Sequence, residues 1–119
     1  MLGFGSHQRY YLYRGGVDMR KGFDGLSGVV RNELGSDPMS GDVYIFFNSS
    51  RRTVKMLVWD RDGFVVYAKR LEKGTFEQLD GIMGGKSSVI SYHHLVMLLS
   101  GISLVGLRQR PRYEMPKTG

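Results

Sequence analysis

The sequence has 119 residues and no cysteine, and Lys and Arg outnumber Asp and Glu 17 to 11, for a net charge of +6. This length predicts a single domain with one hydrophobic core. The missing cysteines exclude disulfides and Cys-ligated zinc. No apolar run approaches the ~20 residues of a membrane helix, and residues 1–13 lack the layout of a signal peptide. We therefore expect a bacterial-type, cytoplasmic protein that has no cofactor and does not contact a membrane. Its surplus of positive charge attracts polyanions such as DNA or RNA.

The first third of the chain predicts a strand followed by a helix. Residues 10–13 are aromatic and are followed by a Gly-rich turn, which is typical of a strand and its end. Asp18 stands where a helix N-cap is expected. Apolar residues then recur at helical spacing up to Gly35, which is placed to end the helix: Met19, Phe23, Leu26, Val30 and Leu34. Glycines at steps of three predict that this helix packs closely against a sheet: Gly22, Gly25 and Gly28.

The remaining chain predicts a three-stranded antiparallel meander and a second helix. The three strands are residues 43–47, 54–59 and 64–71, joined by a polar loop and by a tight turn at 60–63. Residues 72–88 are rich in Gly, Lys and Ser and predict a mobile loop. Ser91 is placed to cap a helix that ends near Gly101 and carries Leu95, Leu98, Leu99 and Ile102 on one side. We expect an α+β fold, an antiparallel meander sheet of three to five strands packed by one or two helices. Residues 1–107 form the domain and residues 108–119 a basic tail.

Two groups of basic residues are candidate nucleic-acid contacts. The first lies around the predicted hairpins: Arg51, Arg52, Lys55, Lys69, Arg70 and Lys73. In a meander, the loop after the first strand and the end of the third lie at the same edge, so these charges can converge and pair with phosphates. The alternative is a solvated hairpin rim. The second group lies in the tail, where basic residues bind phosphates without reading bases, or simply keep a terminus soluble: Arg108, Arg110 and Arg112.

Three further patterns favour structural roles. Residues 14–26 contain Arg20 and Lys21 at a helix start, where a phosphate can bind, but a helix cap by Asp18 explains the same residues. The aspartates that a metal nuclease would need look like turn formers or caps, so we expect no enzyme activity. His93 and His94 are adjacent and would point about 100° apart on a helix, which is unsuitable for one metal ion.

Four ordered blocks carry a resemblance to a known family. They are Val17-Asp18-Met19-Arg20-Lys21-Gly22-Phe23-Asp24-Gly25-Leu26, Asp37-Pro38-Met39-Ser40-Gly41, the stretch from Arg51 to Phe64, and Lys69-Arg70-Leu71-Glu72-Lys73-Gly74-Thr75-Phe76. Over residues 7–107 the chain resembles the TnpB-type accessory proteins of bacterial insertion sequences of the sixty-six family. The resemblance implies a role in DNA transposition alongside a separate transposase, and it supplies no catalytic residues.

Two hypotheses follow for the molecular role. In the first, the chain is a non-catalytic accessory factor that binds the DNA of the element ends through its basic hairpin loops and tail. In the second, it is an assembly factor that docks on the transposase, or on its own copies, without contacting DNA. The second hypothesis rests on the aromatic, two-faced sheet, which could leave an apolar patch exposed. The sequence does not decide whether the chain forms a homo-oligomer.

Overall fold

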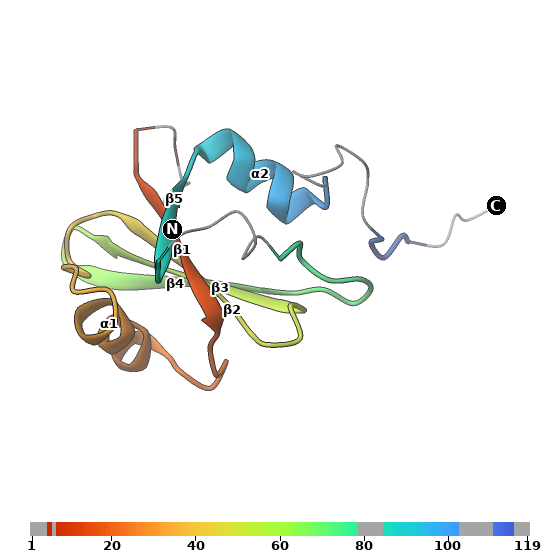
Figure 1. The fold of residues 1–119 in the computed structure, drawn as a ribbon. Helices are drawn as coiled ribbons and strands as arrows, with labels where there is room; N and C mark the ends of the chain where they lie inside the picture. The colour runs from red at the N-terminus through yellow and green to blue at the C-terminus, as the bar shows by residue number, and fades with distance from the viewer. Residues whose placement is uncertain (1–4, 6, 79–84, 103–110, 116–119) are drawn as a thin grey trace.

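The computed structural model describes residues 5, 7–78, 85–102 and 111–115, and within them a five-stranded sheet carries one helix on each face (Figure 1). The strand order across the sheet is β4-β3-β2-β1-β5. This arrangement confirms the predicted α+β fold. The elements, in chain order, are β1 (Tyr10–Gly16), α1 (Phe23–Asn32), β2 (Val43–Phe47), β3 (Thr53–Asp60), β4 (Gly63–Arg70), β5 (Ser87–Ile90) and α2 (Tyr92–Ser100).

Strands β2, β3 and β4 form the predicted antiparallel meander, with Tyr44 opposite Leu57 and Met56 opposite Tyr67. The other two strands were not anticipated in this arrangement. Strand β1 pairs with β2 in parallel, because the connection through α1 returns the chain to the end of the sheet where β1 began. Strand β5 pairs antiparallel with β1 and begins at Ser87, inside the segment expected to be a loop. The same segment also buries Phe76, which is 1% exposed.

The two faces of the sheet support two separate hydrophobic clusters. On one face, Leu95 and Leu98 of α2 pack with side chains of β1, β2 and β3 and with Phe76. On the other face, Leu26 and Val30 of α1 pack with Tyr44, Phe46 and Leu57. Every residue of β2 is buried, as expected for a central strand that is covered on both faces. The helices therefore cover the middle of the sheet, and the polar side chains collect at its two ends.

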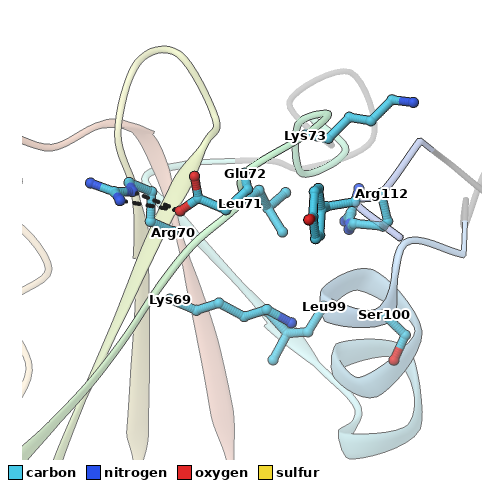
Figure 2. A pocket seen from close by; sticks show the side chains of 9 residues that line it. Lys69, Arg70, Leu71, Glu72, Lys73, Leu99, Ser100 and Arg112 are labelled. Carbon is cyan, nitrogen blue, oxygen red and sulfur yellow. Dashed lines mark hydrogen bonds and ion pairs between the residues drawn. The ribbon is translucent and has the colours of Figure 1, made fainter. Parts of the chain in front are cut away.

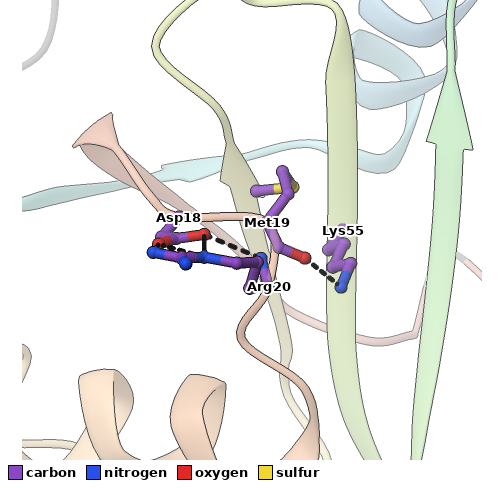
Figure 3. A network of polar contacts seen from close by, with 4 residues as sticks. All are labelled: Asp18, Met19, Arg20 and Lys55. Atoms are coloured by element: carbon purple, nitrogen blue, oxygen red, sulfur yellow. Dashed lines mark hydrogen bonds and ion pairs between the residues drawn. The ribbon is translucent and has the colours of Figure 1, made fainter.

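Helix α1 begins later than the sequence predicted, because Asp18 is not its N-cap. The cap position is Gly22, which makes no side-chain cap hydrogen bond. The Asp18 carboxylate instead accepts the backbone N–H of Arg20 at 2.8 Å and pairs with its guanidinium at 2.6 Å. These bonds hold residues 18–20 in a turn (Figure 3), and the side chain competes with the helix for the backbone donor.

The glycines of α1 do not bring it close to the sheet, so that prediction was wrong. A Cβ atom added at Gly22 would meet nothing within 4 Å, and one at Gly28 would meet only the Asn32 side chain at 3.9 Å. At Gly25 the neighbour is the Lys21 side chain. Phe23, assigned to the apolar stripe, is 53% exposed. The buried residues of the helix are Leu26, Ser27 and Val30, with Val29 partly buried against the same cluster, so the packing of α1 does not use its glycines.

Helix α2 confirms the predicted caps. The Ser91 hydroxyl accepts the backbone N–H of His94 at 3.1 Å, and Gly101 ends the helix with a left-handed φ of 88°. A hydroxyl residue is a common N-cap of a helix, and a glycine is common where a helix ends. Leu95 and Leu98 are buried as expected. No helix in the described ranges is long and apolar enough to cross a membrane.

Candidate nucleic-acid interface

The strand directions gather positive charge at one end of the sheet, which we call the basic end. Strands β1, β2 and β4 finish there, and β3 and β5 begin there. The β1–β5 ladder continues to this end, where the backbone N–H of Arg14 donates to the carbonyl of Lys86 at 2.8 Å. Four different strands and their loops thus contribute the cations. The exposed members of the basic end are Arg14, Arg52, Lys69, Arg70, Lys73 and Lys86.

The loop after β2 and the end of β4 do meet, as the meander predicted. The backbone N–H of Leu71 donates to the Arg52 carbonyl at 2.7 Å, and Thr53 lies opposite Arg70. Their side chains, however, divide between the two faces of the sheet. Because side chains alternate along a strand, Arg70 lies on the α1 face and Lys69 on the α2 face. The cations therefore share one end of the sheet and not one face.

The guanidinium of Arg51 is engaged inside the protein. It lies 4.1 Å from the centroid of the Phe47 ring and donates to the carbonyls of Phe76 and Glu77. The backbone N–H of Phe76 in turn donates to the Arg51 carbonyl at 2.7 Å. Arg51 has a left-handed φ of 60°, which turns it inward while its neighbour Arg52 is exposed. Arg51 thus joins the β2–β3 turn to the segment after β4.

Lys55 also makes internal contacts. Its ammonium donates to the carbonyl of Met19 at 2.7 Å (Figure 3). It also donates to the carbonyl of Lys21 at 3.0 Å. These bonds tie the segment between β1 and α1 to strand β3, and they hold residues 19–21 in a non-helical conformation. Arg20 is paired with Asp18, which lowers the pKa of that carboxyl to about 2. Lys21, in contrast, remains exposed.

The tail is described only in part. Arg108 and Arg110 lie outside the described residues. Arg112 donates to the carbonyl of Thr75 at 3.2 Å, and its guanidinium carbon lies 5.3 Å from the centroid of the Phe76 ring. The segment 111–115 therefore lies against the chain that follows β4. The proposed boundary between domain and tail stays a prediction.

Sequence reasoning missed Arg14 and Lys86 as members of the basic end. They are separated by more than half of the chain and meet only because β5 pairs with β1. No sequence signal identified β5, since four residues rich in Ser at the end of a Gly-rich segment do not stand out as a strand. Once β5 is recognised, the antiparallel register places Lys86 beside Arg14 without further assumption.

A pocket of about 270 Å³ lies beside the basic end (Figure 2). Its walls come from the end of β4 and the residues after it, from the C-terminal turn of α2, and from Arg112 and Tyr113. Arg70 and Glu72 form an ion pair of 3.1 Å at one side. The lining residues are Lys69, Arg70, Leu71, Glu72, Lys73, Leu99, Ser100, Arg112 and Tyr113.

The opposite end of the sheet, which we call the acidic end, has the other sign. It holds the loop before β2 and the tight turn between β3 and β4. Its acids are Asp37, Asp42, Asp60 and Asp62, and its cations are Arg9, which pairs with Asp42 at 3.3 Å, and Arg61. Within the described ranges, no three His, Asp or Glu side chains gather as metal ligands would. These four aspartates lie in or beside the loops at this end of the sheet.

Comparison with known proteins gives a consistent result. Residues 8–109 match the family described as IS66 Orf2 like protein. The uncharacterized protein y4hO of Sinorhizobium fredii is 33% identical over 102 residues, which are 86% of this chain and 87% of that protein. The uncharacterized protein y4jC of the same organism is 28% identical over 98 residues, 80% of each chain. No solved structure matches the chain.

Proposed function

Because this chain belongs to the IS66 Orf2-like family of transposition accessory proteins, we propose that it acts in transposition as a non-catalytic DNA-binding factor. The basic end of the sheet is the surface that meets the DNA. The partners are the DNA of the element ends and a separate transposase subunit, in the cytoplasm of the bacterial cell.

The observation that carries this proposal is the separation of charge along the strands. Six exposed cations collect at the basic end, where Arg70 forms the one ion pair among them in the described residues. Lysine and arginine side chains that are not neutralised by carboxylates raise the local potential and attract phosphates. The acidic end repels the same phosphates. DNA is therefore oriented toward one end of the molecule.

The internal contacts of Arg51 and Lys55 narrow the set of cations to which we assign phosphate contacts. The guanidinium of Arg51 and the ammonium of Lys55 already donate to backbone carbonyls. Exchanging those bonds for phosphate contacts would leave the carbonyls without a hydrogen-bond donor. We assign direct contacts to Arg14, Arg52 and Lys86, and we assign Arg51 and Lys55 to holding the loops that present them.

The test compares two triple variants with the same change in net charge. One replaces Arg14, Arg52 and Lys86 with Gln at the basic end, and the other replaces Arg9, Arg31 and Arg61 with Gln away from it. Affinity for element-end DNA is measured by fluorescence anisotropy as a function of salt. The first variant should lower the slope of log affinity against log salt by about 0.9 for each lost phosphate contact, and the second should leave it nearly unchanged. The proposal is contradicted if both variants lose the same amount of DNA affinity, or if the wild type does not bind DNA at low salt.

The second candidate function is docking on the transposase, and exposed apolar residues on α2 favour it. The sheet faces, on which this hypothesis first rested, are covered by the helices. Tyr92 and Val96 are instead 38% and 43% exposed, and residues four apart lie on the same side of a helix. Exposed apolar groups of this kind are common at protein interfaces.

Co-purification with the transposase separates the two candidates. Docking through α2 predicts a complex that survives nuclease treatment and is lost in a Tyr92→Ser, Val96→Ser double variant. The triple Gln variant of the basic end serves as the control, since it should leave a protein-mediated complex intact. A complex that disappears with nuclease assigns the association to shared DNA.

A further inference from the structure

The pocket beside the basic end combines cationic, apolar and aromatic side chains. Cations line it from two segments, with Lys69 and Lys73 from the chain around the end of β4 and Arg112 from the tail. Leu71 and Leu99 supply apolar wall, and Tyr113 supplies an aromatic ring that is 55% exposed. An anion with an attached planar, partly apolar group fits such a set of walls.

The two lysines are available to a ligand. Both are exposed, and within the described residues neither makes an ion pair or a side-chain hydrogen bond. Figure 2 shows Lys69 extending toward Leu99 at one rim of the pocket, Lys73 at the opposite rim, and Arg112 between them. Among the described residues that line the pocket, the one acid is Glu72, and it is paired with Arg70. The pocket therefore keeps a net positive charge.

The size of the pocket limits what enters it. A volume of about 270 Å³ is just below the range of roughly 300–1,000 Å³ that is usual for small-molecule sites. It holds one nucleotide and not a longer segment. A base within a duplex is stacked and paired, so its ring faces are not accessible to a side chain. An unpaired base, in contrast, stacks readily on tyrosine while basic residues hold the phosphate.

We propose that this pocket binds one unpaired nucleotide of DNA, with its phosphate between Lys69 and Lys73 and its base against Tyr113. This inference rests on the proposed function, because it gives the DNA-binding surface a preference for duplex that carries a single-stranded end. Duplex phosphates contact the basic end, and the unpaired nucleotide beyond them enters the pocket.

The experiment measures the affinity of the full chain for a blunt duplex, for the same duplex with a short single-stranded overhang, and for a short single-stranded oligonucleotide. The overhang should strengthen binding about fivefold or more, the gain expected when one base stacks on an aromatic side chain. Tyr113→Leu should remove the gain and leave blunt-duplex affinity unchanged, whereas Tyr113→Phe should keep it. Tyr92→Leu is the matched control, since Tyr92 is also exposed but lies at the far end of α2 from the pocket.

A charge pair completes the design. Lys73 belongs to the basic end and also lines the pocket, so Lys73→Gln should weaken the overhanging duplex more than the blunt one. Lys86 belongs to the basic end but does not line the pocket, so Lys86→Gln should weaken both duplexes alike. Circular dichroism confirms that each variant is folded.

The outcomes separate the two proposals. Equal binding of blunt and overhanging duplexes overturns the pocket and leaves duplex binding in place. Binding of the single-stranded oligonucleotide alone, with the same sensitivity to Tyr113→Leu, supports the pocket and contradicts duplex binding by the basic end. Competition by inorganic phosphate with no effect of Tyr113→Leu reduces the pocket to a simple anion site and overturns the nucleotide.

Discussion

Both ends of the sheet consist of loops that connect strands, but their charged residues make different contacts. At the acidic end, the turn between β3 and β4 is closed locally, with Asp60 opposite Gly63 and the backbone N–H of Asp62 donating to the Asp60 carbonyl. At the basic end, the turn between β2 and β3 is crossed by the chain after β4, and Arg51 fastens the two together. Distant segments also meet at the acidic end, where Arg9 pairs with Asp42 at 3.3 Å, but that pair is exposed, whereas Arg51 is bonded inside the protein.

This difference teaches that basic residues at the basic end have two separate tasks. Arg51 and Lys55 donate to backbone carbonyls and hold loops in place, while Arg52 and its exposed neighbours present charge to solvent. Net charge alone does not distinguish the tasks. Substitutions that remove one task and keep the other distinguish them.

The largest expected effect comes from Arg51→Ala compared with Arg52→Ala. Arg51→Ala removes the contact with Phe47 and the bonds to two carbonyls, and we expect the free energy of unfolding to fall by about 3 kcal/mol. Arg52→Ala changes an exposed side chain and should shift it by less than about 0.5 kcal/mol. Urea denaturation measures both. DNA affinity should follow the opposite order once both variants are folded, and equal stabilities would remove the distinction between the two tasks.

A smaller effect is expected for Gly74→Ala compared with Gly41→Ala. Both glycines have left-handed φ angles, 81° and 90°, so alanine costs about 1 kcal/mol at each. A Cβ at Gly74 would also collide with the Pro111 carbonyl, whereas one at Gly41 meets nothing within 4 Å. We expect Gly74→Ala to destabilise by about 2 kcal/mol in total and to displace segment 111–113 from the pocket. Thermal unfolding gives the first quantity, and loss of the gain from an overhang gives the second. Identical effects of the two variants would show that the tail does not press on Gly74.

The smallest effect concerns Asp18, whose pKa is lowered from 3.8 to about 2, chiefly by hydrogen bonds from Arg20. A carboxyl with a lowered pKa in the folded state contributes stability above pH 3.8, and this contribution disappears as the pH falls through about 2. Arg20→Gln should return the pKa of Asp18 toward 3.8, as measured by NMR titration of its side-chain carbon. Arg9→Gln, at the acidic end, is the control and should leave it at about 2. A pKa of Asp18 that does not respond to Arg20→Gln would place the cause elsewhere in the turn.

Local signals were sufficient where neighbours in sequence determine the conformation. The meander from β2 to β4 follows from apolar runs separated by turn residues, and helix α2 follows from Ser91 and Gly101 at its ends. The start of α1 could not be predicted in this way, since an aspartate such as Asp18 can either cap a helix or close a turn before it. The bond from Lys55, which lies far along the chain, pins the non-helical one.

The sequence by itself determined the surplus of positive charge, the three meander strands β2, β3 and β4, the second helix and the family. Tertiary structure decided how those charges are used. The parallel pairing of β1 with β2 and the antiparallel pairing of β5 with β1 set which strand ends share an edge, and hence that Arg14 and Lys86 join Arg52. The physical reason is that an exposed cation and a cation bonded to a distant carbonyl have the same sequence signature. Only the fold shows which carbonyls lie within reach of each side chain.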